Sequence, residues 1–185
     1  MIVKKILLSV CTMLQLTELA SEIEQDETSE EVKLMLACVN YVNNIIATDY
    51  IKIYKTVEIS VEDSAQEIEF SQISSHTFLG VKSVIDESGN KINFTVTDSG
   101  LKVYKNGKMK VRFAYFPDEL LLDDSITNYK TKINERIFAY GVAAEYLFIK
   151  GIVDDASMWD ERFKRELLTI TRKLKSTILP IRKFK

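Results

Sequence analysis

The sequence predicts an α+β protein in which a four-helix bundle carries an inserted antiparallel β-hairpin module. Three observations predict this class. Apolar residues recur at spacings of three and four near both ends of the chain, as in amphipathic helices. In the middle third they alternate with polar residues and are mostly aromatic or β-branched, which is typical of strands. The 185 residues include only 6 glycines and 2 prolines, which favours long helices over a structure built from loops.

The first two helices of the bundle are expected at about residues 2–24 and 30–47, within an N-terminal segment 1–49. In the first helix the apolar stripe runs from Val3 to Ile23. A polar break follows it, and Thr28 or Ser29 can then cap the second helix, whose apolar stripe is wide enough to pack on more than one side.

The first fourteen residues also allow a targeting signal. Lys4 and Lys5 precede a run of about nine apolar residues, and Leu8-Ser9-Val10-Cys11 resembles a lipoprotein cleavage box. The run is short for a signal, and Val10 is bulky where such a box has a small residue. We therefore favour a helix and keep a cleaved signal as the alternative. No stretch approaches the roughly 20 apolar residues of a membrane span.

The antiparallel β module is expected at residues 50–117, with several hairpins. Turn signals lie at residues 86–90, 98–100 and 105–108. Asn106-Gly107 is the strongest short hairpin signal in the chain. Because helical patterns flank the module on both sides, it is expected to be an insertion and not a separate domain.

The other two helices of the bundle are expected at about residues 126–150 and 155–177, within a segment 118–178. Gly151 fits a C-cap between them. The segment Ile178-Leu179-Pro180-Ile181 is expected to end the last helix, and residues 179–185 form a basic C-terminal arm.

Few residues in the chain are suited to catalysis. His76 lies in a predicted loop with no nucleophile or carboxylate placed beside it by spacing, so we expect an exposed loop histidine. Cys11 and Cys38 fall on apolar helix faces and are expected to be buried free thiols, while a disulfide between them would need an oxidising compartment.

The acidic pairs Asp123-Asp124 and Asp154-Asp155 could bind a cation, but helix capping explains them more simply. The chain has no phosphate loop, dinucleotide fingerprint or zinc spacing. We therefore expect no catalytic residue, no metal site and no cofactor, and we expect that the protein is not an enzyme.

The net charge of −2 is a cancellation between two oppositely charged segments. Residues 15–31 contain seven acids and no lysine or arginine: Glu18, Glu22, Glu24, Asp26, Glu27, Glu30 and Glu31. From Arg162 onward Glu166 is the only acid. The basic residues of the last helix form a predicted basic face: Arg162, Lys164, Arg165, Arg172, Lys173 and Lys175. A solvated helix face with a frayed tail would explain this pattern. Opposite poles also suit head-to-tail contacts between copies, which close into rings when the rotation allows it. Nucleic-acid binding by the basic tail is a rival, but interleaved aromatics other than Phe184 are lacking.

Several local motifs resemble one family of proteins. They include Leu16-Thr17-Glu18-Leu19, Val39-Asn40-Tyr41-Val42, Tyr140-Gly141-Val142-Ala143-Ala144-Glu145-Tyr146 and Met158-Trp159-Asp160-Glu161-Arg162-Phe163. With these motifs and with two N-terminal helices, a β module and a final helix pair in that order, the chain resembles head–tail connector (adaptor) proteins of tailed phages and prophages. Within these connectors it resembles the tail tubular protein A and tail accessory factor group. The resemblance covers nearly the whole chain in architecture, and its motifs concern packing.

The resemblance implies a structural protein of the virion, made in the host bacterial cytoplasm, that catalyses no reaction. It implies a dodecameric ring at the head–tail junction, between the portal and a downstream tail or stopper protein. DNA would pass through the channel without sequence-specific binding, and no membrane would be involved. The arm that would dock on the portal comprises Leu179, Pro180, Ile181, Arg182, Lys183, Phe184 and Lys185.

Four aromatic residues are candidates for anchoring the last two helices or for subunit contact: Tyr140, Tyr146, Trp159 and Phe163. Two rival interpretations remain beside the connector. The first is a secreted or lipid-anchored bacterial binding module with a cleaved N-terminal signal. The second is a small enzyme of unrecognised type, which a deep pocket collecting Asp123, Asp124 and His76 would favour.

Overall fold

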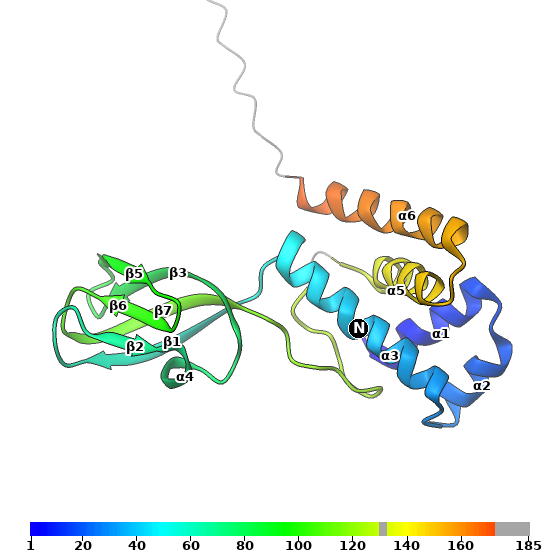
Figure 1. Ribbon diagram of the computed structural model, residues 1–185, viewed down its shortest axis with the longest axis horizontal. Helices are drawn as coiled ribbons and strands as arrows, with labels where there is room; N and C mark the ends of the chain where they lie inside the picture. The colour runs from blue at the N-terminus through cyan, green and yellow to red at the C-terminus, as the bar shows by residue number, and fades with distance from the viewer. Residues whose placement is uncertain (130–132, 173–185) are drawn as a thin grey trace, which may run out of the picture.

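The computed structural model describes residues 1–129 and 133–172, and they form two lobes (Figure 1). One lobe is helical, and the other is the β module. Within the described residues there are six α-helices and seven strands in two antiparallel sheets. The α+β class therefore matches the sequence-based expectation, but the predicted four-helix bundle is wrong.

The helical lobe is arranged around one central helix instead of being a bundle. α5 packs against α1, α3 and α6, while α1 and α3 have few contacts with each other. This follows from the composition of α5, whose residues from Ile137 to Ala144 are all buried. A helix that is apolar all round must be covered on several sides. The helices of the lobe are α1 (Val3–Leu14), α2 (Thr17–Glu24), α3 (Glu30–Ile45), α5 (Glu135–Ile149) and α6 (Val153–Thr171).

The single helix expected at residues 2–24 is broken into α1 and α2. Gln15 ends α1 with a φ of 59°, in the left-handed region, and the backbone N–H of Leu16 donates to the carbonyl of Cys11 at 2.9 Å. This is the geometry of a helix C-terminus in which a non-glycine residue takes the left-handed position. The break turns α2 away from α1, so the N-terminal segment is not one long bundle helix.

The second expected helix begins where predicted and ends differently. The Ser29 side chain caps α3 by accepting from the backbone N–H of Val32 at 3.2 Å. After Ile45 the chain continues as a short π-helix, η1 (Ile46–Tyr50), in which the N–H of Ile51 donates to the carbonyl of Ile46 at 2.7 Å. The β module consequently starts at Tyr54 and not at residue 50.

The helix expected at residues 126–150 begins nine residues later than predicted, at Glu135. Ile126 forms a backbone hydrogen bond from its N–H to the carbonyl of Met1 at 2.7 Å, so this segment pairs with the N-terminus instead of starting a helix. The Asn134 side chain supplies the cap by accepting from the N–H of Ile137 at 3.0 Å. Gly151 follows α5 with a φ of 77°, as a helix-ending glycine does.

The β module contains two sheets. The first has the strand order β1-β7-β3-β4, and the second has the order β2-β6-β5. A short helix, α4 (Phe70–Ile73), follows β2. The strands are β1 (Tyr54–Val61), β2 (Glu67–Glu69), β3 (Phe78–Asp86), β4 (Lys91–Ile92), β5 (Phe94–Val96), β6 (Gly100–Val103) and β7 (Gly107–Tyr115).

The hairpin predicted at Asn106-Gly107 is not formed, because β6 and β7 belong to different sheets. The segment between them carries the chain from one sheet to the other. Lys105 in this segment pairs with Asp86 at 2.8 Å, at the end of β3. This contact holds the connection against the turn that follows β3, where the predicted 86–90 turn does form.

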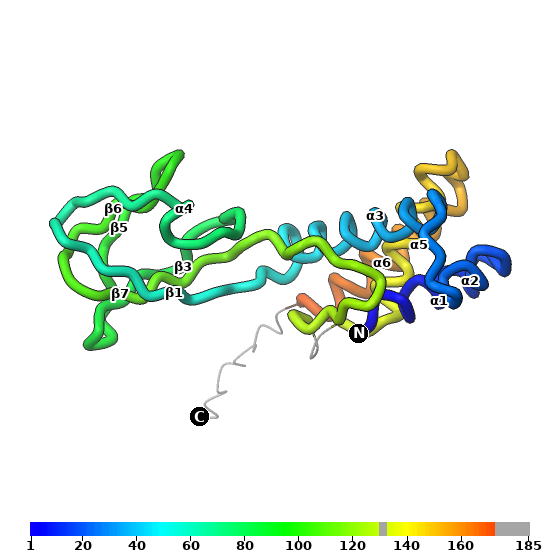
Figure 2. Tube along the Cα trace, turned by 90° about the horizontal axis from the view of Figure 1, so that it is seen from below, coloured from blue at the N-terminus to red at the C-terminus, as the bar shows by residue number. Residues whose placement is uncertain are grey.

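Each lobe has its own hydrophobic core. Val84, Leu101, Val111 and Phe113 are fully buried in the core of the β module. The other core surrounds α5 in the helical lobe. Figure 2 shows the lobes at opposite ends of an elongated molecule, joined by two neighbouring segments of chain, one before β1 and one after β7. In the described part of the chain, no helix is both long and apolar enough to cross a membrane.

Replacing Asp86 by asparagine is expected to destabilise the β module at pH 7 and much less at pH 2. Lys105 and the backbone N–H of Asn90 hydrogen-bond the carboxylate and lower its pKa from 3.8 to about 2. A carboxylate with a depressed pKa contributes stability above its unfolded pKa, and this contribution is lost as the pH falls through the folded pKa. Urea unfolding followed by circular dichroism should show a difference in the free energy of unfolding between wild type and Asp86→Asn. This difference should shrink as the pH falls from about 4 to about 2. A difference independent of pH would contradict the assignment.

Candidate subunit-contact surface

An apolar groove of about 660 Å³ opens at the outer end of the helical lobe. We call it the corner groove, because it lies between the α1–α2 corner and the start of α6. Met13, Leu14 and Leu16 line one side, and Ile152, Met158 and Trp159 line the other. A groove of this size with an apolar lining is suited to a protein segment or a small molecule.

Exposed apolar side chains cluster beside the corner groove, at the turn between α5 and α6. Large exposed hydrophobic residues that gather in one place mark an interaction surface more often than scattered ones do. Here the exposed fractions lie between 41% and 56%, and the residues are Phe148, Ile149, Ile152, Val153 and Met158.

Tyr146 and Lys150, which line the corner groove, bind Glu31 of α3. The Tyr146 hydroxyl donates to Glu31, and the Lys150 ammonium pairs with the same carboxylate at 2.7 Å. Hydrogen bonds from Lys150 and then Tyr146 lower the pKa of Glu31, while burial raises the pKa of Tyr146. Two bonds to one carboxylate fix α5 against α3, so Tyr146 helps to hold the shape of the groove.

Tyr140 and Trp159 connect α5 to α6 at the edge of the corner groove. Their ring centroids are 5.4 Å apart, with an angle of 30° between the planes. The Arg162 guanidinium lies over the indole at 4.8 Å from its centroid, and Arg136 donates to the Tyr140 hydroxyl. Trp159 is partly buried, so one part of its ring packs on α5 while another lines the groove. Both of the roles considered for Trp159, helix anchor and subunit contact, are compatible with this position.

Phe163 lies in the core, where three elements meet. A Cβ placed on Gly141 would come within 2.9 Å of both the Phe163 ring and Val42, so the absence of a side chain on Gly141 admits the ring between α5 and α3. The Tyr50 ring of η1 packs edge-on against Phe163, with centroids 6.4 Å apart. Phe163 is 4% exposed, so it anchors α6 and is unavailable for contact with another subunit.

The predicted basic face is only partly available for binding. Lys164 pairs with Asp160 at 2.6 Å, an interaction that raises the pKa of the lysine. Arg165 and Arg172 make no ion pair with another described residue. They flank Leu168, which is 60% exposed, and together these three form what we call the α6-end patch. Lys173, Lys175 and the arm at residues 179–185 lie outside the described residues.

Acidic side chains stand around the corner groove. Asp155 lines it directly, and Glu18 and Glu22 line a shallower depression on α2 that shares Leu16 and Tyr146 with it. Glu22 accepts a hydrogen bond from Ser29 at 2.6 Å, whereas Asp155 and Glu18 have no ion-pair partner in the described part of the chain. The groove therefore has an apolar lining, with Asp155 unpaired among the described residues at its edge and Lys150 paired with Glu31 beside it.

His76 is not the exposed loop residue that the sequence suggests. Its side chain is 15% exposed. Nδ1 lies 3.1 Å from Asp118, Nε2 lies 3.0 Å from the Lys55 ammonium, and the ring packs on Tyr115 with centroids 4.5 Å apart. Lys55 can only donate, so Nε2 is the acceptor for the ammonium and Nδ1 is the nitrogen that faces Asp118. Both ring nitrogens are engaged, so His76 positions the chain where β7 leaves the module.

The acidic pairs lie in a loop and in the first turn of a helix. Asp124 accepts from the backbone N–H of Leu121 at 2.7 Å in a loop and does not cap the helix expected there. Asp154 and Asp155 lie in the first turn of α6, where their charge suits the helix dipole. Among the described residues no group of three or more histidine, cysteine or acidic side chains is placed to hold a metal ion.

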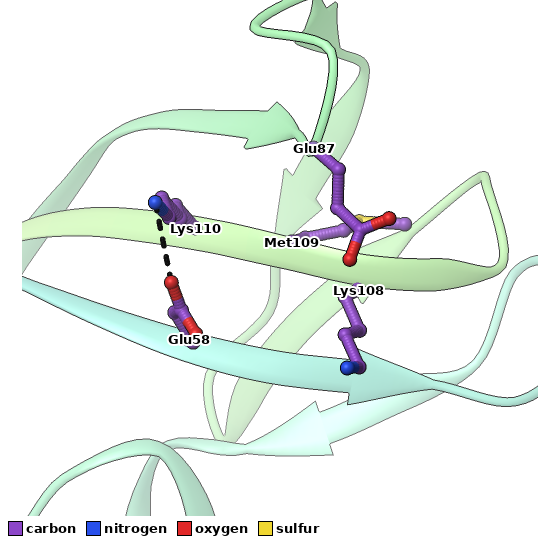
Figure 3. Close-up of a pocket in the computed structure, with 5 residues that line it drawn as sticks. All are labelled: Glu58, Glu87, Lys108, Met109 and Lys110. Atoms are coloured by element: carbon purple, nitrogen blue, oxygen red, sulfur yellow. Dashed lines mark ion pairs between the residues drawn. The ribbon is translucent and has the colours of Figure 1, made fainter.

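A second pocket, on the β module, is small and charged. It measures about 180 Å³ and is lined by Glu58, Glu87, Lys108, Met109 and Lys110 (Figure 3). Lys110 pairs with Glu58 at 3.2 Å across β7 and β1. The lining side chains of opposite charge come from neighbouring strands of an open sheet, which is the ordinary arrangement of a solvated sheet face. We assign no ligand to it.

Cys11 and Cys38 are both free, and each is 1% exposed. Burial raises the pKa of Cys11 to about 11 and that of Cys38 to about 12. Because the thiolate is the reactive form, neither should react with iodoacetamide at pH 8 in the folded protein. Mass spectrometry should find both alkylated only after unfolding in urea. Rapid labelling of either thiol without denaturant would contradict their placement.

The sequence pointed to the aromatic members of this surface but missed the corner groove itself. Helical periodicity places Met13, Leu14 and Leu16 in one continuous helix, whereas the structure exposes them at a corner between two helices. One signal was present: apolar residues continue on both sides of Gly151, where a turn between helices is usually polar.

Comparison with known proteins adds no relative. The chain matches no protein-family model, and a search of curated proteins finds no match.

Proposed function

We propose that this protein is a structural head–tail connector of a tailed phage or prophage. It would form a ring between the portal and the tail, around the channel through which DNA passes, and it would act without catalysis or a cofactor. The proposal combines the sequence resemblance with the surfaces of the helical lobe. In it, the downstream partner is a tail or stopper protein, and the ring is dodecameric.

The observation that carries the proposal is the separation of charge along the helical lobe. α6 starts at the outer end of the lobe, beside α1 and α2, and ends nearer the β module (Figure 1, Figure 2). The acidic segment and the corner groove lie at the outer end, while Arg165 lies in the last two turns of α6 and Arg172 follows the last residue of that helix. A head-to-tail ring requires that each subunit carry two different, complementary surfaces at separate places.

The two-lobed shape also supports a connector. The helical lobe carries the exposed apolar cluster, and the β module projects away from it (Figure 2). One lobe can therefore build a ring while the other reaches a different partner. The C-terminal residues follow the basic end of α6, and in this proposal they extend to the portal.

The structure of α1 supports keeping the first fourteen residues in the folded protein. Val3, Ile6, Leu7, Val10 and Cys11 are all buried in the helical core. Cleavage before Cys11 would remove the first four side chains from that core, at a cost of about 1.5–3 kcal/mol for each buried aliphatic residue. This favours the connector over the binding module with a cleaved signal.

The deciding experiment is native mass spectrometry of the full chain, alone and mixed with the portal of the same phage or prophage. We expect a closed ring of identical copies, in isolation or once the portal is present. The matched control is a portal from an unrelated phage, which should not recruit the protein. A chain that stays monomeric under both conditions would overturn the proposal.

A further inference from the structure

We infer that the corner groove receives the α6-end patch of a second copy of this chain, so that copies join head to tail through these two surfaces. The inference rests on the proposed ring and specifies its subunit interface.

The corner groove has the chemistry to receive such a patch. Its bed is apolar, and Ile152 and Met158 are 47% and 42% exposed in the isolated chain. Asp155 lines it without an ion-pair partner among the described residues, Lys150 lines it with its charge paired to Glu31, and Glu18 and Glu22 lie on the adjoining surface of α2. An occupant should therefore present an apolar side chain next to positive charge.

The α6-end patch presents that combination on described residues. Leu168 is 60% exposed, and Arg165 and Arg172 lie beside it on the same surface. Arg165 and Leu168 are three residues apart on one face of α6, and Arg172, the residue that ends the helix, lines the same depression. Within the described residues neither arginine is neutralised by an ion pair, which leaves both charges for a partner.

The two surfaces cannot meet within one copy. Met158 and Leu168 lie on the same straight element, ten residues apart, which at the rise of an α-helix is about 15 Å. A rigid helix keeps that separation, so only a second copy can bring its α6-end patch into the groove. Because the two surfaces differ, the contact is heterologous and generates a ring or an open filament.

Two other occupants compete for the groove. The chain's own residues 173–185 contain Leu179, Ile181 and Phe184 among basic residues, and a segment of the portal is also conceivable. We place the α6-end patch in the groove because it is a preformed helical surface and because the proposed function engages the arm elsewhere. The experiment below separates the three occupants.

The test is thiol cross-linking between copies with a short bis-maleimide. Three variants of the full chain are made: Met158→Cys, Leu168→Cys and the double variant. Each is cross-linked under conditions in which native mass spectrometry detects oligomers. Portal is added if the protein assembles only in its presence. The native cysteines are buried and have raised pKa values, so the engineered thiols react selectively. We expect a covalent dimer when the two single variants are mixed, no dimer from either one alone, and a ladder from the double variant.

Specific results would overturn the inference. A dimer from Met158→Cys alone would indicate an isologous contact between two grooves. A Met158→Cys, Ile181→Cys double variant that cross-links within one chain would place the arm in the groove, and a cross-link from Met158→Cys to the portal would place the portal there. Oligomers that give none of these products would also exclude this interface.

Charge reversal provides an independent measurement. Asp155→Arg and Arg165→Glu should each weaken self-association by roughly tenfold or more, and the double variant should recover much of the loss. Lys108→Glu is the matched control, because it changes an exposed charge on the β module, and it should leave self-association unchanged. Equal losses in the single and double variants would count against direct pairing.

The outcomes also separate this interface from the proposed function. Rings that form without a cross-link between residues 158 and 168 would leave the connector proposal standing and reject the interface. A chain that remains monomeric with and without portal would reject both.

Discussion

Replacing Phe163 by alanine is expected to lower the free energy of unfolding of the helical lobe by about 3–5 kcal/mol. The ring is 4% exposed and fills the space between Gly141, Val42 and Tyr50. Removing it leaves a cavity where α6 meets α3, α5 and η1.

Urea unfolding followed by tryptophan fluorescence measures this effect. Trp159 is the only tryptophan in the chain and lies in α6, so its emission reports on the helical lobe. The matched control is Leu168→Ala, which removes an apolar side chain from the same helix where it is 60% exposed, and it should change stability by less than about 0.5 kcal/mol. Similar losses in both variants would show that Phe163 is not a core anchor.

Phe113→Ala should destabilise the β module by a comparable amount, about 3–5 kcal/mol. Phe113 is fully buried on β7 and stacks on Phe78 with centroids 4.0 Å apart, while Tyr115 meets it edge-on at 6.2 Å. The substitution removes the buried ring together with both aromatic contacts, which add to the value of burial alone. Circular dichroism in the strand region is the appropriate probe.

The two substitutions together test whether the cores unfold separately. We expect Phe113→Ala to shift the dichroism transition of the β module and to leave the Trp159 fluorescence midpoint near that of wild type, since the lobes have separate hydrophobic clusters. Val96→Ala, at a site 49% exposed on β5, is the matched control. An equal shift of both probes would mean that the lobes unfold as one cooperative unit.

The sequence predicted element types well where periodicity is strong. The strand pattern, the turn at residues 86–90 and the buried cysteines are all found in the structure. These features depend on local pattern and on side chains whose environment follows directly from their apolar character.

The errors arose where one residue or a distant contact decides the geometry. Gln15 adopts a left-handed conformation, which a glycine at this position would have indicated. Because the residue is not glycine, the continuous apolar stripe predicts one helix where the structure has two. Ile126, Tyr129 and Ile133 are spaced as on one face of a helix. In the structure, however, Ile126 pairs with Met1, and Ile126 and Tyr129 are buried in the helical lobe without forming a helix. The division of the strands into two sheets depends on long-range pairing that turn signals do not encode.

The same limits apply to the candidate surface. The four aromatic residues were proposed together, yet the structure separates Phe163, which faces the core, from Trp159, which reaches the groove. Periodicity places both on the apolar side of α6 and cannot rank their exposure. The corner groove needed the α1–α2 corner, which itself depends on Gln15.

The two chain crossings between the lobes lie next to each other. The N–H of Tyr115 donates to the carbonyl of Ile53 at 3.3 Å, and Tyr54 is paired with Ala114. The chain therefore leaves the helical lobe and returns to it at neighbouring positions, as it does around an inserted domain. During evolution a module attached in this way can be exchanged, enlarged or shortened without moving any helix of the host lobe. Proteins that share this helical lobe could thus keep it unchanged while the β module differs.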